Sequence, residues 1–264
     1  MKRLVWLVII MMMVTIAGCS SGSAAKIDKV SDLQGKVIGA ADPGIKVTDS
    51  LIAKITGVQP REVQSFTRFS DCVTALRTGK VDAVFMPKFC AEYSAKRNSD
   101  LKIISKDQPG KVSVVMCVRK DDQPLKEELD KAISALQKNG TLKLLADEWI
   151  TNLPANNEPT SKEIPKIEGA KTVYVGVTGS LAPLDYIAAD GRPAGYNVAL
   201  LTEIGKLMNI NFEFVSLEPR ARFAALSSKK IDLIFCQLAE APIENCLITN
   251  PYFSSDGASF LVKK

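Results

Sequence analysis

The side chains that could carry chemistry in this chain are limited first by a missing residue type. None of the 264 residues is a histidine. Ser-His-Asp and Cys-His nucleophilic centres, histidine general bases and histidine-ligated zinc sites all need an imidazole ring, so the sequence excludes them. An enzyme built on this chain would have to use carboxylates, Lys, Tyr, Cys or a cofactor.

The first of the six cysteines, Cys19, directly follows an apolar segment. Residues 1–3 are a short basic start and residues 4–17 are apolar apart from Thr15. These 14 residues would rise only ~21 Å as a helix, less than the ~30 Å hydrocarbon core, which favours a signal-peptide core over a membrane span. The sequence Ile-Ala-Gly-Cys at 16–19 resembles the lipobox of bacterial lipoproteins, which implies diacylation of Cys19.

We therefore expect a lipoprotein signal peptide at residues 1–18 and a tether at 19–30, and a membrane lipoprotein that faces the periplasm or the cell exterior. An uncleaved anchor with an incidental cysteine is the alternative. In either case the rest of the chain would lie outside the cytoplasmic membrane.

Charge and composition exclude other classes of protein. The chain has 34 Lys and Arg against 29 Asp and Glu, a net charge of +5, and its basic residues are interspersed rather than clustered. A phosphate-binding groove needs clustered cations, so we expect no nucleic-acid partner. With 46% hydrophobic and 24% charged residues, the composition is that of a globular protein with one large domain or two small ones.

The elements that must position these side chains alternate between strands and helices, which is typical of an α/β layer architecture. Ser70 is expected to cap the start of one helix and Gly79 to end it. The expected strands are at 36–40, 62–66, 83–85, 173–177, 212–215 and 233–235, and the expected helices are at 47–55, 70–77, 125–138, 142–150, 198–208 and 222–227.

The two halves of the chain share a repeated sequence. Residues 75–85 (ALRTGKVDAVF) and 225–235 (ALSSKKIDLIF) align without a gap, and Ala, Leu, Lys, Asp and Phe are identical. Many α/β proteins contain such a helix end, turn and buried strand, so coincidence is the alternative, but we favour two similar lobes. Residues 151–170 are polar and contain three prolines, which predicts an extended linker.

Two sets of motifs stand out along the chain. The first is Val173–Val177, Ala182–Tyr186, Gly195–Leu200, Asn250–Phe253 and Ala258–Lys263, and the second is Asp32–Lys36, Val81–Val84, Leu101–Ile104, Val112–Arg119 and Glu148–Trp149. Together they resemble the type 2 periplasmic binding proteins of solute-binding family 3, the polar amino acid kind. Residues 172–264 are similar to the first half of such a protein and residues 30–150 to its second half. The resemblance implies an α/β fold with two lobes, each a doubly wound mixed sheet, joined by hinge strands.

The two halves stand in the reverse of the family's order. We interpret this order as a natural circular permutation, because chain ends that lie close together at a surface can be joined without altering the core. A fragment of a tandem pair of binding proteins is the rival interpretation. The expected boundaries are lobe 2 at residues 31–114 and lobe 1 at residues 115–264, which includes the linker.

The resemblance implies that a solute lies between the lobes, held in the usual member by an Arg on its carboxylate and an Asp on its ammonium. This sequence departs at both positions. No Lys or Arg occurs from Ile231 to Val262, so the Arg is missing, and the Asp position falls at Pro87. Burying a carboxylate without a charged partner costs several kcal/mol, so we expect a small polar or anionic solute, amino-acid-like but not gripped as an α-amino acid.

Other side chains could compensate for these losses. Arg220 and Arg222 begin a helix, and Lys46 lies in a loop that matches the family's anion-binding turn; for these cations a solvated surface is the alternative. Leu181 replaces an aromatic residue that usually stacks on the solute. The expected ligand-binding residues are Gly44, Lys46, Pro87, Thr178, Leu181, Arg220, Arg222, Cys236 and Gln237.

The remaining cysteines divide by their surroundings. Cys72 and Cys117 lie in apolar stretches and are expected to be core residues. Cys236 and Cys246 flank the loop that, by the resemblance, carries the carboxylate-binding Arg in the family and is shorter here. A disulfide would rigidify this loop; free thiols are the alternative.

These observations favour a lipid-anchored, monomeric solute-binding protein that delivers a small solute to an ABC permease, with no catalytic residue, metal or cofactor. One alternative is a prephenate- or arogenate-type dehydratase, for which Asp185, Glu240 and Glu244 would have to supply the acid and base groups. A ligand-sensing module is another.

Overall fold

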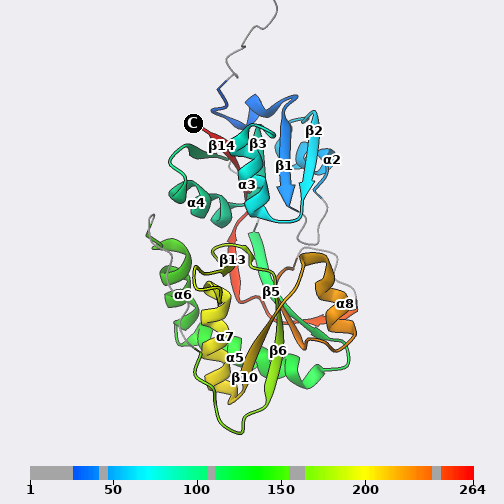
Figure 1. Cartoon of the computed structure of the whole chain (residues 1–264), viewed down its shortest axis with the longest axis vertical. Helices are drawn as coiled ribbons and strands as arrows, with labels where there is room; N and C mark the ends of the chain where they lie inside the picture. The colour runs from blue at the N-terminus through cyan, green and yellow to red at the C-terminus, as the bar shows by residue number, and fades with distance from the viewer. Residues whose placement is uncertain (1–25, 42–46, 106–110, 155–163, 240–244) are drawn as a thin grey trace, which may run out of the picture.

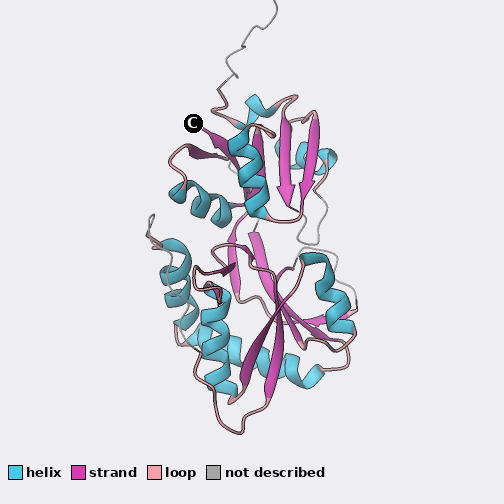
Figure 2. Ribbon diagram, viewed as in Figure 1, coloured by secondary structure: helices cyan, strands magenta, loops and turns pink. Residues whose placement is uncertain are grey.

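Two α/β lobes lie one above the other along the long axis of the protein (Figure 1). The computed structural model describes residues 26–41, 47–105, 111–154, 164–239 and 245–264, without the side chains of residues 236–238. Each lobe has one mixed sheet with helices packed against it (Figure 2). The expected α/β fold with two mixed sheets is thereby confirmed.

The first lobe is built on a sheet with the strand order β2-β1-β3-β14-β4. Strand β1 lies inside the sheet, and all five of its residues are buried. Strands β2 and β3 run parallel to β1, whereas β14 runs antiparallel to β3. The elements of this lobe are η1 (Val30–Leu33), β1 (Val37–Ala41), α2 (Asp49–Thr56), β2 (Glu62–Phe66), α3 (Phe69–Thr78), β3 (Ala83–Pro87), α4 (Lys88–Arg97), β4 (Leu101–Ile104) and β14 (Ala258–Lys263).

The second lobe repeats this plan with the strand order β10-β6-β11-β5-β12. Strand β5 runs antiparallel to β11, and β13 also pairs with β5. The elements are β5 (Lys111–Arg119), α5 (Gln123–Lys138), α6 (Thr141–Ala146), the π-helical turn η2 (Asp147–Thr151), β6 (Thr172–Val177), α7 (Tyr196–Met208), β10 (Asn211–Ser216), η3 (Pro219–Ala221), α8 (Arg222–Ser227), β11 (Leu233–Leu238), β12 (Cys246–Ile248) and β13 (Phe253–Asp256).

A small antiparallel sheet extends the second lobe towards the first. It consists of β7 (Ser180–Leu181), β8 (Asp185–Ile187) and β9 (Pro193–Ala194). Its first strand, β7, begins three residues after the last residue of β6. Residues 178–181 therefore lie beside the carboxyl end of β6.

The sequence repeat corresponds to a structural repeat. In the first lobe the Asp82 N–H donates to the Val37 carbonyl at 2.8 Å, and the Val37 N–H donates to Asp82 Oδ2 at 2.8 Å. In the second lobe Asp232 makes the same two bonds with Tyr174, at 2.8 and 2.9 Å. The Asp of each repeat therefore fixes the start of one strand against its parallel neighbour, which confirms the prediction of two similar lobes.

Two connections cross between the lobes. One leads from β4 to β5, and the other leads from β13 to β14 (Figure 1). We had placed residues 115–264 in one lobe, but β14 pairs with β3 and β4 of the other lobe. Likewise β5 begins at Lys111, ahead of the expected boundary. Both differences have the same cause. Strands β5 and β14 each follow a connection between the lobes, and each pairs with the sheet of the lobe that the chain enters.

The tether and linker are more ordered at their ends than expected. Ile27 and Val30, inside the expected tether, are buried in the first lobe. At the end of the linker, Asn211 Oδ1 accepts from the Ile167 N–H at 2.8 Å, and Asn211 Nδ2 donates to the Ile167 carbonyl at 2.8 Å. Hydrogen bonds and apolar burial thus hold these segments onto the lobes.

Most expected elements are present within a few residues of their predicted ends. Helix α3 begins at Phe69 and its N-cap is Arg68, so the predicted Ser70 cap is wrong, whereas Gly79 ends the helix with φ 78°. Among the described residues no helix has the length and hydropathy to span a membrane. The expected signal peptide and Cys19 lie outside the described residues.

Candidate functional site

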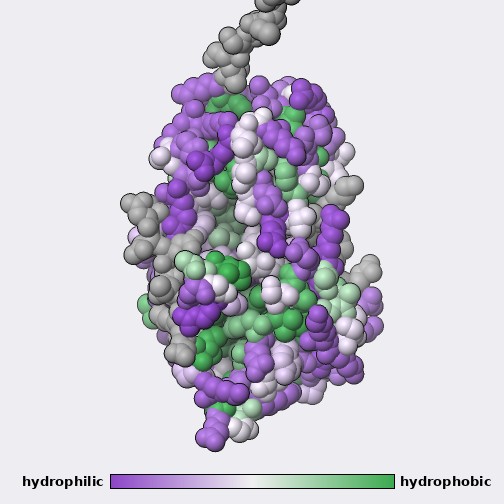
Figure 3. Space-filling view, in the orientation of Figure 1, coloured by the Kyte–Doolittle hydropathy of each residue, from purple (hydrophilic) through white to green (hydrophobic). Residues whose placement is uncertain are grey.

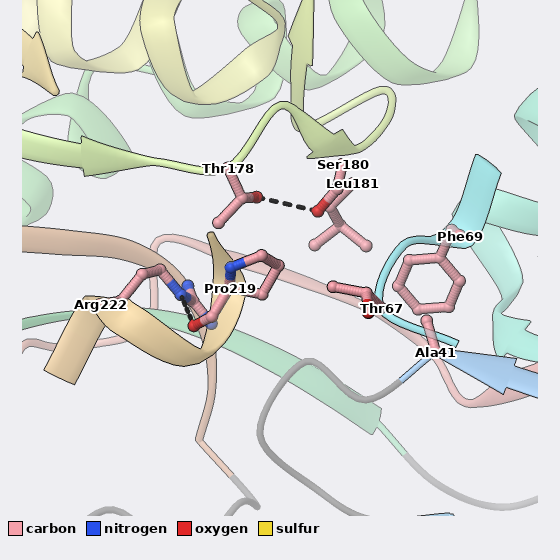
Figure 4. Close-up of a pocket in the computed structure, with 8 residues that line it drawn as sticks. All are labelled: Ala41, Thr67, Phe69, Thr178, Ser180, Leu181, Pro219 and Arg222. Atoms are coloured by element: carbon pink, nitrogen blue, oxygen red, sulfur yellow. Dashed lines mark hydrogen bonds between the residues drawn. The ribbon is translucent and has the colours of Figure 1, made fainter. Parts of the chain in front are cut away.

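A pocket lies between the two lobes (Figure 4). The first lobe contributes Ala41 from the end of β1, Thr67 from the turn after β2, and Phe69 from the start of α3. The pocket has a volume of about 20 Å³, close to the space of one water molecule. The second lobe contributes Thr178, Ser180, Leu181, Pro219 and Arg222.

The two lobes present equivalent elements to this pocket. Phe69 opens α3, and Pro219 opens the short η3–α8 segment, which follows β10 as α3 follows β2. The pocket therefore lies at the carboxyl ends of parallel strands, where α/β sheets place their ligands. Its lining is half apolar, with hydroxyl groups from Thr67, Thr178 and Ser180 and one cation.

The cation, Arg222, is buried, with only 4% of its surface exposed. Its Nε donates to the Pro219 carbonyl at 3.2 Å and its Nη1 donates to the Phe235 carbonyl at 3.3 Å. The alternative of a solvated helix face is therefore wrong. Arg222 joins η3 to β11 and places a positive charge at the floor of the pocket.

A buried carboxylate lies behind the Thr178 turn. Asp185 is 1% exposed, and its Oδ2 accepts from the Thr178 N–H at 3.0 Å, the Thr178 hydroxyl at 2.9 Å and the Gly179 N–H at 3.1 Å. Burial raises the pKa of Asp185, while these hydrogen bonds and the charge of Arg222 oppose the rise. The hydroxyl of Thr178 also lies 2.9 Å from that of Ser180.

A wider groove of about 500 Å³ adjoins the pocket at Phe69 and Ser180. It runs between α3 and α4 of the first lobe and residues 179–187 of the second, on the face shown in Figure 3. An ion pair crosses the boundary at its edge, from Arg68 Nη2 to Glu218 Oε1 at 2.9 Å. The lobes are therefore in contact through charged as well as apolar groups.

The expected site residues are only partly brought together. Thr178, Leu181 and Arg222 line the pocket. Arg220 is exposed and Pro87 is buried in a strand pair with Ala258, and neither lines the pocket. The expected Gly44 and Lys46, together with the side chains of Cys236 and Gln237, lie outside the described structure.

Sequence reasoning missed the contribution of Thr67, Phe69 and Ser180. The repeat could have indicated the first two, because Thr67 and Phe69 stand at the start of α3 as Leu217 and Pro219 stand at the start of the η3–α8 segment. Ser180 gave no signal of its own, since a serine between Gly179 and Leu181 is also typical of a solvated turn.

The cysteines differ from expectation in one pair. Cys246 is a free thiol, so the disulfide that we considered between it and Cys236 is not formed. Its neighbour is Cys117, on the adjacent strand β5. Their hydrogen bond and burial raise the pKa of Cys117. The same hydrogen bond lowers the pKa of Cys246, against the opposing effect of burial. Cys72 and Cys117 are both fully buried, as expected of core residues.

Curated relatives align with about half of the chain. The L-cystine-binding protein TcyJ of Escherichia coli is 26% identical over 140 residues, which is 51% of this chain and 51% of that protein. The arginine-binding extracellular protein ArtP of Bacillus subtilis is 26% identical over 133 residues, 44% of this chain and 52% of that protein. The chain thus spans about half the length of these relatives.

Solved structures align over most of the chain at low identity. The GluR0 ligand-binding core in complex with L-glutamate is 10% identical, with a TM-score of 0.47, over 88% of this chain and 85% of that one. The substrate-binding protein AbpA of Streptococcus pneumoniae, bound to L-arginine, is 14% identical, with a TM-score of 0.42, over 87% and 82%.

A sequence profile covers both lobes. The profile described as bacterial extracellular solute-binding proteins, family 3, matches residues 48–152 and 173–264, and the gap between the matches falls in the linker. These matches cover well over half of the sequence, and the protein therefore belongs to family 3 of the bacterial extracellular solute-binding proteins.

Proposed function

We propose that this protein is the lipid-anchored, extracytoplasmic solute-binding component of an ABC importer, and that it holds a small, polar, amino-acid-like solute between its lobes. The observation that carries the proposal is the pocket to which both lobes contribute, with Thr67 and Phe69 on one side and Thr178 and Arg222 on the other. Because the pocket as it stands has room for about one water molecule, a solute would enter when the lobes move apart about their two connections and would be enclosed when they close on it.

The solute class is supported by the lining and by the relatives. Hydroxyl groups and the charge of Arg222 suit a small polar or anionic compound, and the apolar side chains of Phe69, Leu181 and Pro219 suit an aliphatic or aromatic body. The names of the two relatives given above describe them as binding L-cystine and arginine. Membership in a solute-binding family argues against a dehydratase.

The delivery of the solute to an ABC permease and the attachment to a membrane are further parts of the proposal. The lipid anchor is supported by the Ile-Ala-Gly-Cys sequence at 16–19, directly after the apolar run. Two acyl chains on Cys19 would hold the protein at a membrane stably, where one would not.

A circular permutation of the family's order also belongs to the proposal. It is supported by the return of β14 to the first lobe, because the earliest and latest described strands then share one sheet. Alignments that cover about half of both proteins are expected when a sequence with exchanged halves is compared in linear order. The linker after η2 would then join the family's original ends.

A thermal-shift screen of the chain from Ser20 onward would test the function. The set would contain the standard L-amino acids, L-cystine, dicarboxylates and polyamines. A solute at one hundred times its Kd stabilises the folded state by ~2.7 kcal/mol, which raises the melting temperature by a few degrees.

A variant with Leu181 changed to Arg, which fills the pocket, should lose the stabilisation that wild type gains. Tyr174→Ala, on the exposed side of β6, is the matched control and should keep it. If no compound in the set stabilises the wild-type protein, the proposed function is wrong.

A further inference from the structure

We propose that Ser180 is the hydrogen-bond acceptor for a protonated amine of the solute, and that Asp185 and Thr178 are positioning residues that orient its hydroxyl for this role. The inference rests on the proposed function and adds to it one chemical requirement, a cationic donor on the solute. It follows from the direction of the hydrogen bonds behind the pocket wall.

The first step is that Asp185 Oδ2 can only accept. Two backbone groups, the N–H of Thr178 at 3.0 Å and the N–H of Gly179 at 3.1 Å, point at this oxygen. A backbone N–H has no other role than donation. The other oxygen, Oδ1, is buried and has no hydrogen-bond partner among the described residues. If Asp185 binds a proton, Oδ1 is therefore where it resides, and Oδ2 remains an acceptor.

The second step fixes the two hydroxyl groups. The Thr178 hydroxyl lies 2.9 Å from Asp185 Oδ2 and has one hydrogen, so it donates that hydrogen to the carboxylate. The Ser180 hydroxyl lies 2.9 Å from Thr178 Oγ1, as drawn in Figure 4. Because the Thr178 hydrogen is already engaged, Ser180 must be the donor in this contact.

The third step concerns what Ser180 then offers the pocket. Its single hydrogen points at Thr178, so only its oxygen lone pairs remain for a solute. Ser180 lines both the pocket and the adjoining groove, and it is partly exposed. The buried carboxylate of Asp185 lies two hydrogen bonds behind it, and such chains polarise one another in the direction of the charge.

An amine is the group that fits this arrangement best. None of the described side chains that line the pocket is acidic, and the carboxylate of Asp185 is connected to the pocket through the hydroxyl groups of Thr178 and Ser180. Arg222, at the floor of the same pocket, supplies the opposite charge. A solute with an ammonium near Ser180 and a carboxylate towards Arg222 would satisfy both, without the Arg and Asp that the sequence lacks.

Calorimetry on the full-length protein in detergent would test the assignment with two sets of matched compounds. The first set is L-leucine, isocaproate, which lacks its amine, and isoamylamine, which lacks its carboxylate. The second is L-phenylalanine, hydrocinnamate and phenethylamine. A hydrogen bond to a charged group predicts that each acid without the amine binds about tenfold or more weakly than its parent amino acid.

Variants distinguish a change in the orientation of the Ser180 hydroxyl from a general loss of folding. In Ser180→Ala and in Thr178→Val the preference for the amine-bearing compound should fall to about threefold or less, whereas Thr178→Ser should retain it because a hydroxyl is restored. Thr202→Val, which removes a hydroxyl bonded within α7 away from the pocket, is the matched control and should leave the preference unchanged.

Equal binding of the acids and the amino acids by wild type would overturn the assignment, as would an unchanged preference in Ser180→Ala. Failure of all six compounds to bind would overturn it too. The wider thermal-shift screen then shows independently whether the pocket binds any solute, so the proposed function is judged by a different result.

Discussion

Arg68 and Glu218 are 150 residues apart in the sequence, occupy equivalent positions in the two lobes, and bond to each other across the boundary between them. Arg68 precedes α3 and Glu218 precedes η3. Equivalent positions at the helix starts of the two lobes therefore supply both halves of an interlobe ion pair. The Nη2 to Oε1 distance of 2.9 Å places the pair in direct contact.

Breaking this pair should favour opening of the lobes by a modest amount. The two side chains are 42% and 65% exposed, and exposed pairs of this kind contribute ~0.2–1 kcal/mol. Glu218→Gln should therefore shift the equilibrium between closed and open forms by up to about fivefold at low salt. Single-molecule energy transfer between dyes on the two lobes would measure the shift. The double variant Arg68→Glu with Glu218→Arg re-forms the ion pair with exchanged charges and should restore the wild-type equilibrium. No change in Glu218→Gln would rule out a role in closure.

The turn after the repeated helix offers a matched pair of stability predictions. Gly79 in the first lobe and Lys229 in the second both have positive φ, 78° and 60°. A residue with a Cβ pays roughly 1–2 kcal/mol in this conformation, so Gly79→Ala should lower the free energy of unfolding by about that amount. Among the described residues, an added Cβ at Gly79 would meet only Lys263 Nζ, at an ordinary contact distance of 3.7 Å, so the cost comes from the backbone.

Lys229→Gly removes the same strain and should not destabilise the protein. It also removes the contact between Lys229 Nζ and Asp121 Oδ2 at 3.1 Å, which contributes little because both side chains are exposed to water. Urea unfolding of both variants checks the pair. A stability of Gly79→Ala equal to that of wild type would contradict the argument.

The free thiols should react in a defined order. The pKa of Cys246 is lowered by its hydrogen bond with Cys117, whereas burial raises the pKa of Cys72 to about 12. Because the thiolate is the nucleophile, iodoacetamide should modify Cys246 before Cys72 in the folded protein near neutral pH. In Cys117→Ala the hydrogen bond is lost, and the pH midpoint for alkylation of Cys246 should move upward. Mass spectrometry of the peptides measures both, and faster modification of Cys72 than of Cys246 would refute the order.

Asp185 should make the stability of the protein depend on pH. Burial raises its pKa in the folded state above that of the unfolded chain. Between these two pKa values the folded protein binds the extra proton, so this residue's contribution to stability falls as pH rises through the window. The advantage of wild type over Asp185→Asn should therefore shrink as pH rises from about 4 towards neutrality.

Denaturant unfolding of both proteins at several pH values measures this difference. The comparison with Asp185→Asn removes the contribution of all other titrating groups. A wild-type advantage that grows with pH would show that the hydrogen bonds from Thr178 and Gly179 outweigh burial.

The fold could be predicted largely from the sequence because each lobe repeats one local pattern. The segment from Ala75 to Phe85 contains a helix end, a turn with Gly79 and a buried strand, and it recurs at 225–235. Such signals depend on neighbours in the chain. The lobe boundary was predicted less well, because β14 joins a sheet whose other strands are far away in sequence.

The site was harder to predict because its parts come from separate segments. Arg222 could be picked out as a cation at a helix start, but its burial beneath Pro219 depends on the packing of η3 against β11. Arg220, two residues earlier, gave the same signal and is exposed. A sequence pattern does not distinguish the two, because the direction of each side chain is set by the turn of a short helix.

Strand β14 has a consequence for the order in which the lobes form during synthesis. It lies inside the first sheet, between β3 and β4, yet it is the last of the described strands to leave the ribosome. The second lobe, from β5 to β13, has all its strands before that moment. Domains generally fold as units, starting with the amino-terminal one, but here the earlier-made lobe must wait with an unpaired interior edge until the later-made lobe is complete.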